Sequence, residues 1–197
     1  MLKKKFKSIF ILICAIIITE KSFSIEPNIF VQSTVNRASQ ILSEDTSKNE
    51  KIDKLKVIAK ETVDIRGIGF YTLGKYRKTL NDVQKDKYSE LFYEYFLKSF
   101  SSRLSEYSNP KIDVQSQEKL NENYTIVSSI LVATETRPEV KIQWRIYTKN
   151  PEKPMIRDLI IEGLSLARTQ KEEFASVLNS NNGDVNALFK TLENFIK

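Results

Sequence analysis

The side chains that most often carry enzyme chemistry are nearly missing from this sequence. Its 197 residues include no histidine and a single cysteine, Cys14. The lack of histidine excludes Ser-His-Asp and Cys-His catalysis and histidine-bound zinc. Asp158 and Glu162 are four positions apart in a strand pattern, a spacing of about 13 Å that is too wide for a catalytic pair. We expect each to meet a lysine or arginine across the sheet, with no catalytic and no metal site.

The first 24 residues have the pattern of an export signal. Lysines among residues 3–7 precede an apolar run of about ten residues, Ile9–Ile18, and Ser22-Phe23-Ser24 provides the small residues of a cleavage site. A helix that crosses a bilayer needs about 20 apolar residues, so this run is too short. We therefore predict a secretory signal peptide over residues 1–24, cleaved after Ser24, and a single domain over residues 25–197. An uncleaved anchor is the alternative.

The positive charge of the chain belongs mostly to this leader. Its five lysines and one glutamate leave residues 25–197 with a formal charge of +2, against +6 for the whole chain. No lysine and arginine cluster of the size that nucleic acid requires remains, so we expect no nucleic-acid partner. Cys14 is removed with the leader. A domain of this length buries enough core to fold without disulfides in an oxidising compartment.

Hydrophobic periodicity predicts helices, then strands, then helices. Helical spacing is found at residues 27–43, 50–63, 81–107, 165–178 and 184–196. The strand pattern is found at residues 111–115, 124–133, 140–147 and 155–162. The segment 64–80, which contains three glycines, is expected to be short and irregular. This order predicts an α+β fold in which several helices cover one face of a four-stranded antiparallel sheet.

The helix predicted at residues 81–107 carries more apolar side chains than one packed face requires. Its apolar positions span an arc of roughly 240° at about 100° per residue, whereas a surface helix needs a stripe of only ~100° or somewhat more. One interpretation is a central helix that contacts other elements on two sides. The other is that part of the excess lines a cavity for an apolar guest.

Two stretches of the sequence are similar to a known family. The first is Val63–Tyr76, with Phe70-Tyr71-Thr72-Leu73-Gly74-Lys75-Tyr76 at its end, and the second is Asp158–Ala167, followed by Lys171-Glu172-Glu173-Phe174. Together they resemble the MlaC family of periplasmic phospholipid-binding proteins. The order of the expected helices and strands also resembles that of the family over about residues 28–196. Lys171 stands where that family more often has an arginine.

The resemblance implies a carrier of diacyl phospholipids in the periplasm, with lipid as cargo and no cofactor. Such carriers exchange lipid between an outer-membrane lipoprotein–porin complex and an inner-membrane ABC transporter that bears an MCE-type protein. In this family the acyl tails insert between the helices and a curved sheet, and the head group stays near solvent. The implied fold therefore has an apolar cavity between its layers.

Elementary energetics agree with that role. Two tails of ~15 carbons cost roughly 20 kcal/mol in water, and a pocket that replaces the membrane for them needs ~1,000 Å³ or somewhat more. We expect the wall to come from the long helix, from three strands and from a mouth near residue 70. The candidate lining residues are Phe70, Tyr71, Phe92, Phe96, Phe100, Val132, Ile142, Trp144, Met155, Leu159 and Ile161. For each of them, plain core packing is the alternative.

Three cations are candidates for contact with a head-group phosphate or with an acidic partner: Lys75, Arg77 and Arg145. Simple solvated charge is the alternative for each. Two other functions remain open for the whole chain. One is a periplasmic adaptor or chaperone that binds a protein segment in the same groove or on a sheet edge. The other is a small-molecule enzyme with Asp64 or Asp158 as base, which requires a carboxylate of raised pKa inside the pocket.

Overall fold

The structure, a computed structural model, describes residues 24–197, so the predicted signal peptide lies outside the described residues except for Ser24. The helices are α1 (Pro27–Ser43), α2 (Lys48–Thr62), α3 (Ile65–Thr72), the short 3-10 helix η1 (Gly74–Lys78), α4 (Asp82–Leu104), α5 (Leu166–Ser180) and α6 (Val185–Ile196). The strands are β1 (Ile112–Asn121), β2 (Tyr124–Leu131), β3 (Val140–Tyr147), β4 (Met155–Ile161) and β5 (Leu164–Ser165). Within residues 24–197, no helix combines the length and the apolar character needed to cross a membrane.

The strands form one antiparallel sheet in the order β1-β2-β3-β4-β5, which confirms the predicted α+β class and its meander. The sequence predicted four of the five strands, because β5 has only two residues and leads directly into α5. β1 continues to Asn121, well past the predicted end at residue 115. Its second half is exposed on both faces and polar, so it lacks the alternation that reveals a strand.

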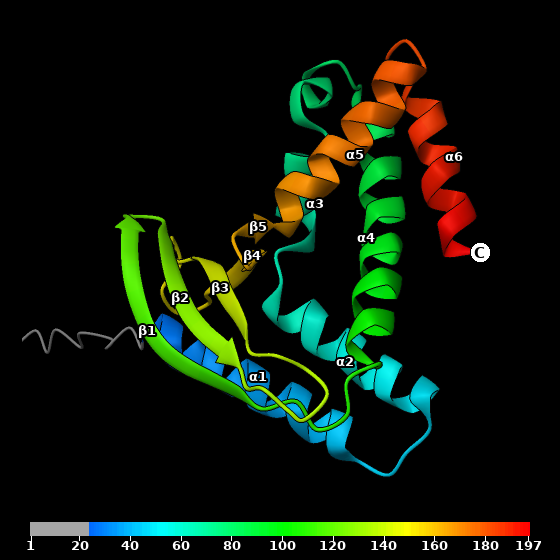
Figure 1. The fold of residues 1–197 in the computed structure, drawn as a ribbon. Coiled ribbons are helices and arrows are strands. Elements are labelled where there is room, and N and C mark those ends of the chain that lie inside the picture. Colours follow the sequence, from blue (N-terminus) through cyan, green and yellow to red (C-terminus); the bar gives the residue numbers. More distant parts are fainter. Residues whose placement is uncertain (1–23) are drawn as a thin grey trace, which may run out of the picture.

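α1 lies along β1 and β2 on one face of the sheet, as Figure 1 shows. Gln117 of β1 accepts a hydrogen bond from the Asn28 backbone N–H at 3.0 Å, and Val127 is its partner in register. The face of the sheet toward α1 is therefore the one that carries Val127, Trp144 and Ile146. All three are buried in one core with residues of α1.

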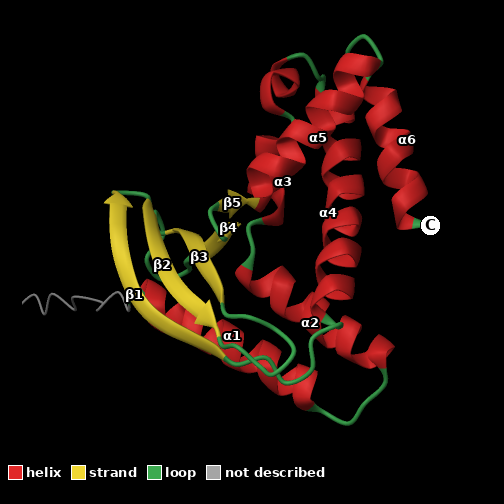
Figure 2. Cartoon of the chain, in the orientation of Figure 1, coloured by secondary structure: helices red, strands yellow, loops and turns green. Residues whose placement is uncertain are grey.

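The other helices form a second group beside β4 (Figure 2). α3 and α5 contact β4, and α4 packs against α2, α3 and α6. The apolar excess of α4 is largely consumed by these neighbours. Phe92 meets Phe174 of α5 edge-on at 6.2 Å between ring centroids, and Tyr95 lies 4.7 Å from Phe195 of α6. The central-helix interpretation of residues 81–107 therefore describes most of this surface.

The segment 64–80 is helical rather than irregular. Asp64 begins α3 by accepting the Gly67 backbone N–H at 2.8 Å, in the manner of an N-cap carboxylate. Gly69 lies against α4 so closely that a Cβ atom there would be 2.8 Å from Cδ1 of Phe92. Glycine has a low helix propensity, so the sequence of this segment does not indicate a helix. The close contact between α3 and α4, which the sequence does not reveal, explains why a glycine is present at Gly69.

Candidate functional site

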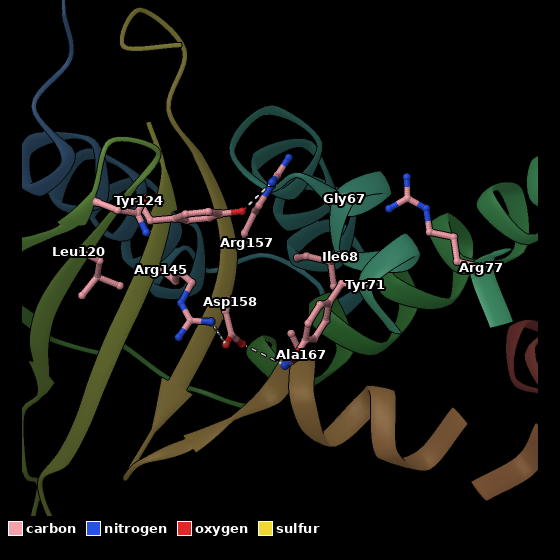
Figure 3. A pocket seen from close by; sticks show the side chains of 11 residues that line it. Gly67, Ile68, Tyr71, Arg77, Leu120, Tyr124, Arg145, Arg157, Asp158 and Ala167 are labelled. Atoms are coloured by element: carbon pink, nitrogen blue, oxygen red, sulfur yellow. Dashed lines mark hydrogen bonds and ion pairs between the residues drawn. The ribbon is translucent and has the colours of Figure 1, made fainter. Parts of the chain in front are cut away.

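A pocket of about 490 Å³ opens between the sheet and α3, on the face of the sheet opposite α1. Figure 3 shows its side chains converging from the strands on one side and from α3 and the start of α5 on the other. We call it the sheet pocket. The strands and their β1–β2 turn contribute Leu120, Asn121, Tyr124, Arg145, Arg157 and Asp158, and the helices contribute Gly67, Ile68, Tyr71, Arg77 and Ala167.

A β-bulge brings two consecutive residues of β4 into the sheet pocket. Arg145 of β3 is opposite Asp158, and the next pair is Ile146 with Ile156, so Arg157 has no partner in register. A bulge breaks the strict alternation of a strand and re-aims side chains. Both Arg157 and Asp158 consequently line the same pocket.

The bulge also corrects one expectation about β4. Met155, Leu159 and Ile161 were all expected in the cavity wall, which by strict alternation puts them on one face and Ile156 on the other, but Met155 is opposite Tyr147, whereas Leu159 is opposite Trp144. Paired residues of an antiparallel sheet point to the same face. Met155 is therefore on the pocket face of the sheet, while Leu159 is on the face toward α1.

The guanidinium of Arg157 ties α3 to the sheet. Its Nε donates to Oδ2 of Asp64 at 2.7 Å, its Nη2 lies 2.6 Å from the same oxygen, and its Nη1 donates to the Tyr124 hydroxyl at 2.7 Å. It also lies 3.6 Å from the ring centroid of Tyr147. Partial burial lowers the pKa of Arg157, but the hydrogen bonds to Tyr124 and Asp64 and the Asp64 charge raise it above its ordinary value. The pocket therefore keeps a fixed positive charge in its wall.

Asp158 holds the start of α5 against β4. It is buried, and its carboxylate accepts hydrogen bonds from Ser165 Oγ at 2.6 Å and from the Ala167 backbone N–H at 3.0 Å. Nη1 of Arg145 lies 3.7 Å away, across the sheet. The expected cross-strand arginine for Asp158 is thus present. Glu162 meets Lys141, but through that residue's backbone N–H, at 2.5 Å.

These partners decide what the site can do chemically. The two candidate bases, Asp64 and Asp158, each accept a hydrogen bond from a backbone N–H and lie within ion-pair distance of an arginine, so both carboxylates are already engaged within the protein. Within residues 24–197, no group of acidic side chains could hold a metal ion. The sheet pocket instead places apolar surface from Ile68, Tyr71 and Leu120 beside three arginines, an arrangement suited to binding an amphiphile with an anionic end.

The predicted site residues lie in several different places. Tyr71, Arg77 and Arg145 line the sheet pocket. Phe70 lines a second pocket of about 760 Å³, to which Tyr71 and Arg77 also contribute. Phe92, Ile142 and Trp144 are buried in the core, and Phe96, Phe100 and Leu159 pack against that core. Val132, Met155 and Ile161 are half-buried, and Lys75 is exposed with its Nζ 5.1 Å from the Tyr76 ring centroid. Lipid contact by these residues stays a prediction.

Sequence reasoning missed several residues that line the sheet pocket: Gly67, Ile68, Leu120, Asn121, Tyr124, Arg157 and Ala167. The expected wall used the sheet face with Ile142 and Trp144, which lies toward α1, whereas the pocket opens on the other face. The sequence contained one indication of the correct face. Arg145 is adjacent to Trp144 in the strand and therefore points to the opposite face, which is the pocket face. Leu120, a large apolar residue in an otherwise polar stretch, was another.

Comparison with known proteins gives three results. A family profile described as "MlaC protein" matches residues 32–194. A Haemophilus influenzae protein named "Intermembrane phospholipid transport system binding protein MlaC" is 24% identical over 187 residues, which cover 90% of this chain and 87% of that protein. A solved structure of a phospholipid-binding protein from Ralstonia solanacearum, in complex with a phospholipid, superposes with a TM-score of 0.73. Its identity is 17%, over 87% of this chain and 97% of the other, so this likeness concerns the fold.

Proposed function

The chain belongs to the MlaC family, and we propose that it is a phospholipid carrier that binds one diacyl lipid between its sheet and α3. The family match over residues 32–194 carries this proposal. The names of the Haemophilus and Ralstonia proteins, which refer to phospholipid, support it. The sheet pocket supplies a place where apolar side chains and arginines lie side by side.

The physical task of such a carrier is to replace membrane for the tails. Burial of each methylene is worth about 0.8 kcal/mol, so the tails need apolar contact along their length. The sheet pocket, at about 490 Å³, is smaller than the ~1,000 Å³ or more expected for two tails. Uptake of a whole lipid therefore requires α3 to move away from the strands. Two hydrogen bonds across that boundary join Asp64, the N-cap of α3, to β4: its carboxylate accepts from Nε of Arg157 at 2.7 Å, and its backbone N–H donates to the Ile156 carbonyl at 2.9 Å.

We further propose that the carrier works in the periplasm, between an outer-membrane lipoprotein–porin complex and an inner-membrane MCE and ABC transporter complex. This assignment comes from the family and from the predicted leader over residues 1–24. One contact is compatible with a mature chain that begins at Ile25. Its backbone nitrogen donates to the Pro151 carbonyl at 2.9 Å, and a free amino group at that position retains a donor.

The test of lipid carriage is the composition of the protein as isolated. We expect organic extraction of protein purified without detergent to release about one phospholipid per chain, detected by mass spectrometry. Leu120→Glu should reduce that amount at least tenfold, because a carboxylate would replace apolar surface of the pocket wall and would lose its hydration when the tails cover it. Leu120 is 46% exposed, so the change does not disturb the core.

Val83→Glu is the matched control, since Val83 is 79% exposed and lines neither of the two pockets. It should leave the lipid content unchanged. An isolated protein without lipid, which also takes up none from vesicles, would contradict the carrier. Normal lipid content in Leu120→Glu would contradict the sheet pocket as its site.

A protein-binding adaptor remains the second candidate because of one observation. β1 is an edge strand of ten residues, exposed over most of its length, and an extended peptide can add to such an edge. This function predicts a lipid-free protein that binds extended peptides. Proline substitution in the exposed half of β1 should block the addition of a peptide to this edge, while β2 stays in place. Loss of peptide binding with normal lipid content would separate the two functions.

A further inference from the structure

The second pocket is a concentration of positive charge built by four elements. It has a volume of about 760 Å³, and we call it the basic groove. Its lining is Arg66, Phe70, Tyr71, Gly74, Arg77, Lys78, Lys85 and Lys171, from α3, η1, α4 and α5. Five of these eight side chains are cationic and none is acidic. A volume in this range is typical of sites for small ligands.

Most of this charge has no internal counter-charge. Within the described part of the chain, Lys85 is the one groove cation with a carboxylate partner, Asp82 at 3.1 Å, and Asp82 is 94% exposed. Like charges gathered in a concave site raise the local potential and the local concentration of anions. The groove is therefore poised for an anionic ligand rather than neutralised by its own residues.

Aromatic rings hold three of the cations in place. The guanidinium groups of Arg66 and Arg77 lie 5.5 and 4.9 Å from the Phe70 ring centroid, and Nζ of Lys171 lies 5.0 Å from that of Tyr71. Cation–π contacts of this kind restrict where a flexible side chain presents its charge. Guanidinium also matches the paired oxygens of a phosphate group. The groove thus offers an ordered set of phosphate donors.

The basic groove adjoins the sheet pocket. Tyr71 and Arg77 line both. A ligand whose apolar part lies between α3 and the sheet can therefore extend its polar end past Arg77 into the groove. The ligand chemistry that fits both is a phosphate diester on an apolar body.

We propose that the basic groove selects the cargo by head-group charge, and favours phospholipids of net negative charge over zwitterionic ones. This inference rests on the proposed carrier function. Both lipid classes carry the phosphate, but a zwitterionic head brings an ammonium group among five cations, whereas a glycerol head does not. Each exposed charge contact is weak, so we expect a preference of about three- to tenfold, which falls as salt screens it.

The experiment measures which lipid the protein removes from a mixture. Delipidated protein is incubated with vesicles of equal phosphatidylglycerol and phosphatidylethanolamine, the vesicles are removed, and the lipids left with the protein are quantified by mass spectrometry. We expect phosphatidylglycerol in about three- to tenfold excess at low salt, and less excess in 0.5 M salt.

The test variant is Arg66→Gln/Lys78→Gln, since both residues are exposed and neither lines the sheet pocket. It should carry the two lipids in about equal amounts. The matched control is Lys111→Gln/Lys190→Gln, which removes the same charge from exposed residues outside both pockets. It should keep the wild-type ratio. Lys78→Glu is a second variant, and it should shift the ratio further toward phosphatidylethanolamine.

The possible results separate this inference from the carrier function. Equal uptake by the wild type, or a preference that survives in the groove variant, overturns the selection while leaving the carrier intact. Failure to take up either lipid contradicts the carrier itself. Sedimentation with phosphatidylglycerol vesicles that depends on the groove, without a biased cargo, would show a membrane-docking surface and overturn the proposal. So would phosphorus NMR that detects inorganic phosphate in the groove with no lipid preference.

Discussion

At the scale of single residues, a buried hydroxyl pair makes the stability of this protein sensitive to alkaline pH. The Tyr88 hydroxyl lies 2.7 Å from Thr72 Oγ1, in the interior between α3 and α4. Burial raises the pKa of Tyr88 well above its ordinary value. The neutral phenol is therefore favoured by the fold. Its stabilising effect is complete below about pH 10, the pKa of an unfolded tyrosine.

We expect stability to fall as the pH rises above about 10, because the unfolded state then ionises Tyr88 while the folded state does not, with a slope of up to about 1.4 kcal/mol per pH unit. Tyr88→Phe should remove about one of the protons released on unfolding at high pH, and should reduce the slope accordingly. Urea unfolding at pH 8 and pH 11 measures it. Tyr95→Phe is a useful comparison, since burial also raises the pKa of Tyr95. Identical slopes in wild type and Tyr88→Phe would contradict the assignment.

The residue type of Trp144 did not decide its role. It is the only tryptophan of the chain, and both cavity wall and core were possible for it. The structure buries it to 8% exposure with its Nε1 donating to Ser129 Oγ at 2.8 Å. A satisfied indole in a close-packed core has a structural role. Its position on the α1 face of the sheet explains why it does not line either pocket.

At the scale of elements, the contact between α3 and α4 depends on a missing side chain. Alanine is favoured over glycine in a helix by about 1 kcal/mol, but a Cβ atom at Gly69 would lie 2.8 Å from Phe92. Overpacking costs about 1–3 kcal/mol. We therefore expect Gly69→Ala to lower the free energy of unfolding by up to about 2 kcal/mol, the net of these two effects.

Chemical denaturation measures this change, and Phe92→Leu provides the control. In the Phe92→Leu background the smaller side chain leaves room, so Gly69→Ala should cost much less or become stabilising. A Gly69→Ala protein more stable than wild type would show that α3 shifts freely against α4. That result would also make α3 easier to displace from the sheet than its packing indicates.

The elements themselves were largely predictable, and the site was less so. Local pattern gives helix and strand type for most of the chain, and the capping box of Asn81 and Gln84 marks the start of α4 in sequence and structure alike. Which sheet face a side chain occupies depends on register. The bulge at Arg157 exchanges the expected faces of Met155 and Ile156, and no local pattern in β4 reveals it. The pocket arginines were found only in part for that reason.

At the scale of the whole molecule, the volume of the sheet pocket and the size of the proposed cargo require a change of shape. α1 lies on the sheet, the other described helices are grouped around α4, and α3 and α5 connect that group to β4 (Figure 1). Separation of α3 from the strands widens the sheet pocket while the α4–α6 packing stays intact. Tyr71 of α3 and Leu120 of β1 line opposite sides of the sheet pocket, with Arg145 and Asp158 drawn between them (Figure 3).

A covalent bridge across this boundary should therefore block lipid uptake. Tyr71 and Leu120 are 45% and 46% exposed, and Cys14 in the leader is the only cysteine in the sequence, so in the chain without its leader Tyr71→Cys/Leu120→Cys is selectively joined by a bismaleimide whose spacer is long enough to cross the pocket. We expect the bridged protein to keep its circular dichroism and to take up at least tenfold less phospholipid from vesicles than the same variant left unbridged. Bridging Leu120→Cys to Asn123→Cys, within the β1–β2 hairpin, should have no effect because it leaves α3 free. Normal uptake by the bridged Tyr71→Cys/Leu120→Cys protein would mean that lipid enters without separating α3 from the sheet.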